Sequence, residues 1–142
     1  MPAGIPPLRA PVGLYLLHLH LHGLFRGQDL ELGRDADTGG QSTYVLELAR
    51  SLAARPEVDR VEVITRQIHD RRVSPDYGEP VEPIGPGASI LRFACGPRRY
   101  LRKELLWPHL EEMADAITAH LSAQSRRPDW IHAHYADAGH VG

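Results

Sequence analysis

Blocks of apolar and polar residues follow one another along this chain and predict strands and helices in turn. The nearly continuous apolar run over 12–21 is typical of a central parallel strand that is covered on both faces. A helix is predicted to begin at Gly39 or Gly40 and to end near Ala54, two residues before Pro56. Its apolar residues recur on one face: Val45, Leu48 and Leu52.

Further strands are predicted over 60–65, 89–95 and 129–133, where β-branched and apolar residues gather. Residues 66–88 hold several prolines and glycines and are interpreted as an irregular excursion. A second helix is predicted with Pro108 in its first turn, where a missing N–H costs little. Its expected buried stripe has helical spacing: Leu110, Met113, Ile117 and Leu121.

This order of elements predicts an α/β fold with a mostly parallel, Rossmann-like sheet. Ligands of such sheets bind beyond the carboxyl ends of the strands. Three polar clusters follow predicted strand ends, over 22–41, 96–104 and 132–140, so we expect them to converge on one site. Residues 1–11 are interpreted as a flexible lead-in and 12–142 as one partial domain. The sequence stops within the expected next loop, which indicates a truncated piece of a larger protein.

Composition excludes several classes of partner. The 142 residues carry 16 Lys and Arg against 18 Asp and Glu, a formal charge of −2, so no basic field favours nucleic acid or an anionic membrane. The run over 12–21 is too short to span a bilayer, and the N-terminus lacks the pattern of a signal peptide. A single cysteine, Cys95, allows no internal disulfide. These features predict a cytoplasmic protein.

The segment before the first helix offers backbone donors. Glycines at positions 39 and 40 leave amide groups at a helix N-terminus open to a ligand, and the helix dipole there favours negative charge. Gln41 adds a donor and an acceptor for sugar hydroxyls. Asp35 and Asp37 are expected to cap the helix and order the loop. An ordinary loop-to-helix junction is the alternative interpretation.

Four cations lie within six positions after the third predicted strand: Arg98, Arg99, Arg102 and Lys103. A guanidinium suits a phosphate dianion because it forms two charge-assisted hydrogen bonds. Arg99 is the candidate phosphate ligand. The other three are expected to face solvent or to steer anions.

The first strand and its end carry His18, His20 and His22, whose alternate spacing places them on one face. Three histidines can bind a metal. No carboxylate or thiolate lies at close ligand spacing, however, and the nine histidines do not cluster otherwise along the sequence, so no metal site is predicted. His22, beside Gly23, is the histidine expected to reach the ligand.

Another candidate group follows the last predicted strand. Tyr135 could stack on a sugar face, while His134 and Asp137 could bind hydroxyl groups. A buried His–Asp hydrogen bond that shapes the loop is the alternative.

Three segments together resemble the N-terminal half-domain of sucrose-phosphate synthases, over roughly residues 12–142. The first is His22–Gly27 with Gly33–Tyr44, the second Gly96–Tyr100 with Leu106–Pro108, and the third His132–Gly139. Thr65–Ile68 also fits the family. Sucrose synthases are similar in the first and third segments.

The resemblance implies one half of a GT-B glycosyltransferase, the side that binds the acceptor. It implies a retaining enzyme that transfers glucose from UDP-glucose to fructose 6-phosphate. By this resemblance Gly39, Gly40 and Gln41 lie against the acceptor and the donor phosphates, Arg99 contacts the acceptor phosphate, and Tyr135 lines the pocket. The family's catalytic His and donor-binding residues lie later in the chain, so no catalytic residue is expected here and these residues alone should be inactive.

The same resemblance implies no tightly bound cofactor, with Mg²⁺ at most a non-essential addition and a C-terminal domain as the missing partner. Two alternatives stay open. Sucrose synthase would use free fructose, although this would leave Arg99 without a partner. A non-catalytic module that binds a sugar phosphate or a metal is the alternative from another class.

Overall fold

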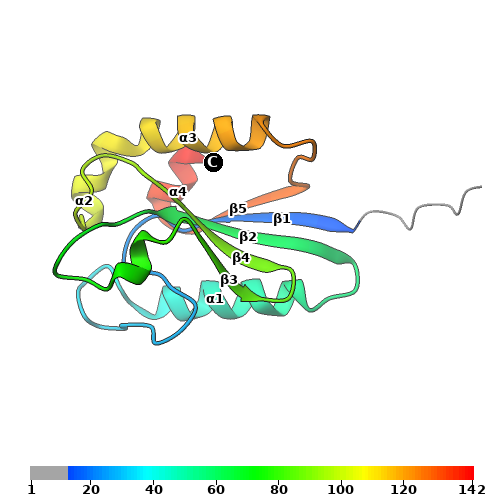
Figure 1. Ribbon diagram of the computed structural model, residues 1–142, viewed down its shortest axis with the longest axis horizontal. Helices are drawn as coiled ribbons and strands as arrows, with labels where there is room; N and C mark the ends of the chain where they lie inside the picture. Colours follow the sequence, from blue (N-terminus) through cyan, green and yellow to red (C-terminus); the bar gives the residue numbers. More distant parts are fainter. Residues whose placement is uncertain (1–12) are drawn as a thin grey trace, which may run out of the picture.

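The computed structural model describes residues 13–142 as a central sheet with helices on both faces (Figure 1). The predicted lead-in over 1–11 lies outside the described residues. The elements follow in chain order: β1 Leu14–Leu19, α1 Gly40–Ala53, β2 Val58–Arg66, η1 Pro75–Gly78, β3 Val81–Gly85, β4 Ala88–Phe93, α2 Lys103–Leu106, η2 Trp107–His109, α3 Leu110–Ser122, β5 Trp130–Ala133 and α4 Tyr135–Val141.

The strands lie in the order β3-β4-β2-β1-β5. β1 pairs in parallel with both β2 and β5, β2 pairs in parallel with β4, and β3 runs antiparallel at the edge. The prediction of a mostly parallel, Rossmann-like sheet is therefore confirmed. The order reverses at β1, because the chain first builds outward through β2 and β4 and then returns to place β5 on the other side. Such a switch point is where open α/β sheets bind ligands, beyond the carboxyl ends of the two strands.

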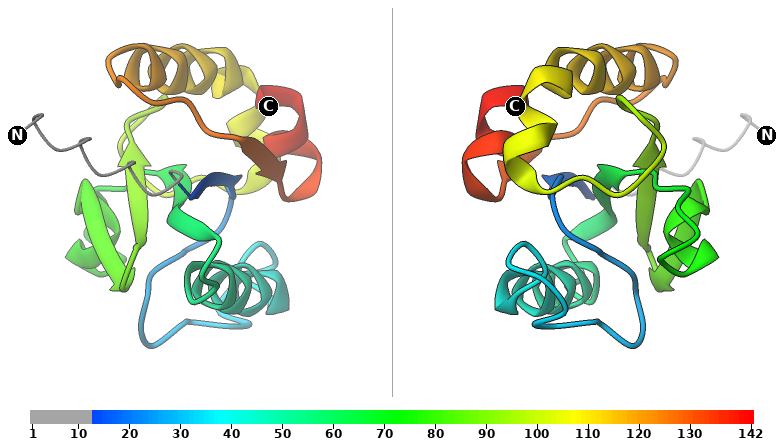
Figure 2. Two further views of the ribbon diagram at one scale, coloured as in Figure 1. Left: turned by 90° about the vertical axis from the view of Figure 1, so that its right-hand side faces the viewer. Right: turned by 90° about the vertical axis from the view of Figure 1, so that its left-hand side faces the viewer.

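Helices lie on either side of the sheet (Figure 2), and an apolar layer joins each side to it. On one face α1 packs over β2 and β4, with Val45, Val63 and Ile90 fully buried. On the other face α3 packs over Leu17 and its neighbours. The predicted stripe of the second long helix lies in this layer, with Leu110, Met113 and Ile117 buried and Leu121 half-buried. Within residues 13–142 there is no helix whose length and apolar character would let it cross a membrane.

The segment 66–88 is more regular than its prolines suggested. It contains η1 and the edge strand β3, where an irregular excursion was predicted. Pro83 lies within β3, opposite Ser89 of β4. A proline is tolerated there because an edge strand has one side free of ladder hydrogen bonds.

Helix α4 begins two residues after β5, where the sequence predicted a loop after the last strand. Its seven residues include Gly139 and too few apolar positions to show a helical pattern. Tertiary contacts hold it instead. Ala138 is fully buried in the layer that contains Met113 and Ile117 of α3, and short helices depend on such packing.

Candidate functional site

The N-terminus of α1 opens onto the carboxyl edge of the sheet. Gly39 is the N-cap residue, and it has no side chain that could accept a capping hydrogen bond from the first turn of α1. Among residues 13–142, no heavy atom beyond their chain neighbours and the helix backbone lies within 4 Å of where a Cβ would stand on Gly39 or Gly40. Neither glycine has a positive φ. Internal packing and backbone strain therefore do not explain these two glycines.

Gly23 differs from that pair because the fold itself requires it. Its φ is +80°, and a Cβ there would lie 2.3 Å from the Asp37 carbonyl oxygen. This close approach brings the start of the β1–α1 loop against its end, and the Leu24 amide donates to Thr38 Oγ1 at 3.1 Å. The loop therefore folds back on itself before α1 begins.

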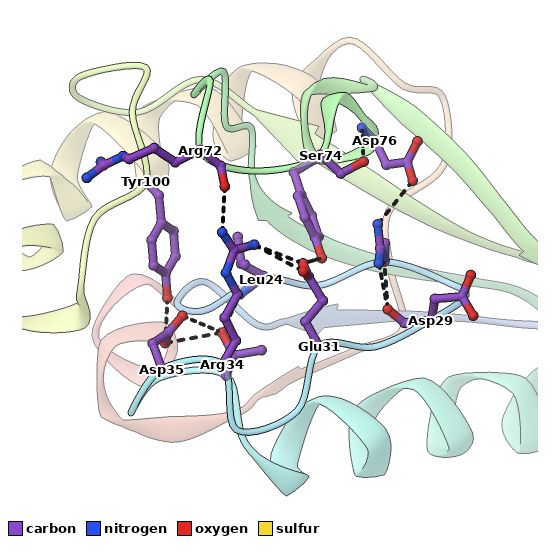
Figure 3. Close-up of polar contacts among 12 residues, drawn as sticks. Leu24, Asp29, Glu31, Arg34, Asp35, Arg72, Ser74, Asp76 and Tyr100 are labelled. Carbon is purple, nitrogen blue, oxygen red and sulfur yellow. Dashed lines mark hydrogen bonds and ion pairs between the residues drawn. The ribbon is translucent and has the colours of Figure 1, made fainter.

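Polar side chains tie this loop to two neighbouring segments (Figure 3). The Tyr100 hydroxyl donates to Asp35 Oδ1 at 2.9 Å, and Arg34 donates to Glu31 at 3.1 Å and to the Arg72 carbonyl. The Asp35 carboxylate also accepts from Thr38 at 3.2 Å. Burial raises the pKa of Tyr100 above its usual value, so its hydroxyl keeps its proton.

Asp37 and Lys103 join the loop to the segment after β4. The Lys103 amide donates to Asp37 Oδ2 at 2.7 Å, and the Lys103 ammonium lies 3.4 Å from Oδ1. The hydrogen bond to Asp37 raises the pKa of Lys103. The same ammonium lies 5.4 Å from the centroid of the Tyr135 ring. The predicted convergence of the three polar clusters is thus observed, although Asp35 and Asp37 order the loop without capping α1.

His22, Tyr135 and Asp137 form the part of the site at the switch point. His22 Nδ1 lies 2.8 Å from Asp137 Oδ2, and both side chains are buried. The Tyr135 ring meets the His22 ring edge-on at 4.7 Å. Tyr135 is half exposed and has a φ of +74°, which is strained for a tyrosine. The buried His–Asp pair therefore holds the base of an exposed, strained tyrosine.

Arg99 lies on an exposed stretch of the 96–104 segment. Its carbonyl accepts from Arg66 Nη2 at 2.9 Å, and Arg66 also donates to the Cys95 carbonyl at 2.8 Å. No hydrogen bond or ion pair engages the Arg99 guanidinium among residues 13–142. The backbone is fixed while the charged group stays available. The sequence analysis missed this role of Arg66. An arginine at the end of a buried strand is the feature that could have indicated it.

The closest ring contacts of His134 are with other histidines. Its Nε2 lies 3.0 Å from His18 Nδ1, and its ring stacks on that of His132 at 4.1 Å. Burial, with a contribution from His132, lowers the pKa of His134 to about 4. Its ring is therefore neutral at neutral pH.

The predicted site residues thus fall into separate groups. His22, Tyr135 and Asp137 touch one another. Gly39, Gly40 and Gln41 begin α1 directly after Asp37, whose carboxylate reaches Lys103. Among residues 13–142, no hydrogen bond, ion pair or ring contact joins the side chain of Arg99 or His134 to either group.

Comparison with known proteins places this arrangement in a family. The glycosyl transferase 4-like domain matches residues 39–142. The chain is 46% identical to "Probable sucrose-phosphate synthase 1" of Oryza sativa subsp. indica, covering 90% of this chain and 14% of that protein. It is 44% identical to "Sucrose-phosphate synthase 1" of Arabidopsis thaliana, covering 89% and 15%.

A solved sucrose-phosphate synthase from Thermosynechococcus elongatus superposes with a TM-score of 0.72 at 25% identity, over 90% of this chain and 29% of that one. The resemblance expected from the three sequence segments is confirmed. The chain spans about one seventh of the length of the curated relatives it matches.

The two kinds of glycine predict opposite effects on stability. Gly23→Ala should lower the free energy of unfolding by about 2 kcal/mol or more, because the new Cβ meets a backbone oxygen at positive φ. Gly40→Ala should leave it unchanged or raise it by up to about 1 kcal/mol, since alanine favours the helix. Urea unfolding of both variants checks this, and equal destabilisation would contradict the assignment.

Proposed function

The chain belongs to the glycosyl transferase 4-like family, and from that membership we propose that it forms the acceptor-binding part of a sucrose-phosphate synthase. The proposed enzyme transfers glucose from UDP-glucose to fructose 6-phosphate with retention at the anomeric carbon, giving sucrose 6-phosphate and UDP. The rice and Arabidopsis relatives and the cyanobacterial structure, each named as a sucrose-phosphate synthase, support this assignment.

The open N-terminus of α1 carries the proposal. Gly39 and Gly40 have free space where side chains would stand, and nothing within residues 13–142 requires glycine at either position. A bound sugar phosphate would account for both, because it needs backbone amides without a Cβ in the way. Gln41, on the first turn of α1, then offers its amide group to sugar hydroxyls.

Arg99 supplies the proposed contact to the acceptor phosphate. Its guanidinium is exposed and is not engaged by the part of the chain that the structure describes, while Arg66 fixes its backbone. A planar guanidinium on a fixed backbone suits the two oxygens of a phosphate dianion. A neutral acceptor would leave this charge without a function.

Tyr135 lines the acceptor pocket in this proposal, with a sugar ring against its exposed face. His22 and Asp137 are then positioning residues, because their hydrogen bond is buried beneath the tyrosine. Lys103 lies beside the same ring and adds positive charge to the entrance. His134 is assigned no contact with the sugar, because its Nε2 already pairs with His18 Nδ1.

The remaining chemistry is proposed to lie outside these 142 residues. The catalytic histidine and the groups that bind UDP-glucose belong to other parts of the proposed enzyme. No tightly bound cofactor is proposed, Mg²⁺ is at most non-essential, and the enzyme is cytoplasmic. UDP-glucose and fructose 6-phosphate are its small-molecule partners.

The alternatives differ in what Arg99 does. A sucrose synthase uses free fructose and gives this guanidinium no phosphate, so comparing activity with fructose and with fructose 6-phosphate separates the two enzymes. A non-catalytic sugar-phosphate-binding module would use Arg99 but would need no second domain.

Arg99→Ala in the complete enzyme should raise the KM for fructose 6-phosphate by about 10- to 100-fold, the loss expected of charge-assisted hydrogen bonds. The KM for UDP-glucose should barely change. Arg98→Ala is the matched control, because it removes a neighbouring exposed cation. Steady-state kinetics with each substrate varied would refute the phosphate contact if both variants behaved like wild type.

Gly40→Ala should impair the complete enzyme without impairing its fold. The added methyl group would stand where the acceptor approaches the helix N-terminus, so we expect at least about a tenfold loss in kcat/KM for fructose 6-phosphate. Thermal unfolding should be unchanged or improved. Wild-type kinetics in a well-folded variant would remove the helix N-terminus from the proposed site.

Calorimetry of the 142-residue chain with fructose 6-phosphate distinguishes two hypotheses: that the chain is part of an enzyme, and that it is a non-catalytic binding module. Weak or undetectable binding is expected, because the proposed donor-binding half completes the cleft. UDP serves as the matched titrant. Micromolar binding of fructose 6-phosphate by the chain alone would favour the module.

A further inference from the structure

Three histidines from two strands meet on the α1 face of the sheet. His18 of β1 lies opposite His132 of β5 in the parallel register, so both side chains leave the same face. His134 follows two residues later, and its amide extends the ladder by donating to the Leu19 carbonyl at 2.9 Å. One ring nitrogen from each histidine lies within 4.8 Å of the other two.

The three imidazole rings pack closely against one another. His18 Nδ1 and His134 Nε2 are 3.0 Å apart, and His18 and His134 are only 2% and 4% exposed. Each ring offers a nitrogen that can bind a metal ion when the imidazole is neutral.

We infer that His18, His132 and His134 form a binding site for a divalent transition-metal ion, with Zn²⁺ as the expected occupant. Zinc binds imidazole nitrogens at about 2.0–2.1 Å in tetrahedral geometry, which separates neighbouring ligands by about 3.4 Å. The three nitrogens lie within 4.8 Å of one another, so rotations of the rings would have to bring them to this spacing when an ion binds. Three imidazoles without an oxygen ligand suit zinc and do not suit Mg²⁺.

Access to this site comes from the side of β5. His132 is exposed, and a surface hollow of about 430 Å³ is lined by His18 and His132 together with Leu16, Leu52 and Trp130. Three protein ligands leave the fourth tetrahedral position for water or a small anion. An ion there would tie β1, β5 and the residue before Tyr135 together. The site does not depend on the proposed function, because none of its three ligands is assigned a sugar contact.

Zinc chloride titrated into the metal-free, untagged 142-residue chain tests the proposal by calorimetry. We expect one ion per chain with micromolar or tighter affinity, and a Tm that rises with zinc concentration. Magnesium chloride should give neither effect. Cobalt(II) should give the intense visible absorption that reports a tetrahedral site.

His132→Ala is the decisive variant, because this exposed ligand can be removed without opening the core. It should weaken zinc binding by at least about tenfold. Losing only the hydrogen-bond partner of a metal ligand already costs about that much affinity, and here the ligand itself is lost. His140→Ala, which removes another exposed histidine on α4, should bind zinc like the wild type. Unfolding without metal should be alike in all three proteins.

The proposal fails on either of two results. Wild-type protein that is folded by circular dichroism and takes up no zinc would refute it. Binding that survives His132→Ala unchanged, or that is lost equally in His140→Ala, would assign the ion to other residues.

Discussion

Parallel pairing of β1 with strands on both of its sides is the constraint on which the rest of this structure depends. Because β2, β1 and β5 all run in one direction, the segments that follow them leave from the same edge of the sheet. The reversal of strand order at β1 then sends α1, which follows β1, and α4, which follows β5, to opposite faces of the sheet and leaves an opening between the two connections. The site residues lie at this opening, as Figure 1 shows for the loops at the carboxyl ends of the strands.

Buried polar contacts convert that opening into a defined surface. The β1–α1 loop is about twenty residues long and lacks regular structure, and carboxylates hold it at several points. Asp37 binds the backbone and ammonium of Lys103, Asp35 accepts from Tyr100, and Asp137 binds His22. Each of these bonds satisfies a group that would be costly to bury alone. Ordering the loop in this way leaves the glycines before and at the start of α1 free for a ligand.

The three histidines in and directly after β1 have different roles, which depend on what the fold places beside them. His22 meets a carboxylate and supports Tyr135, whereas His18 meets two more imidazoles from β5 and its end. His20 lies between them against Phe25, with both ring nitrogens unpartnered among residues 13–142. Burial lowers its pKa to about 3, so this ring behaves as an apolar group. Their alternate spacing predicted one strand face for all three, but β1 ends at Leu19, and the neighbours of each ring decided its chemistry.

Local patterns in the sequence determined the strands β1, β2, β4 and β5, the two long helices and the parallel fold class, because apolar periodicity and the Gly-Gly helix start act over a few residues. The same patterns marked Tyr135 and the cations near Arg99 as chemistry-bearing. Only the tertiary structure decided the rest. Edge position let Pro83 enter β3, burial of Ala138 formed α4, and contacts more than one hundred residues apart paired His22 with Asp137 and brought His18 to His134. Such contacts leave no local periodicity, since they depend on which strand the chain places beside which.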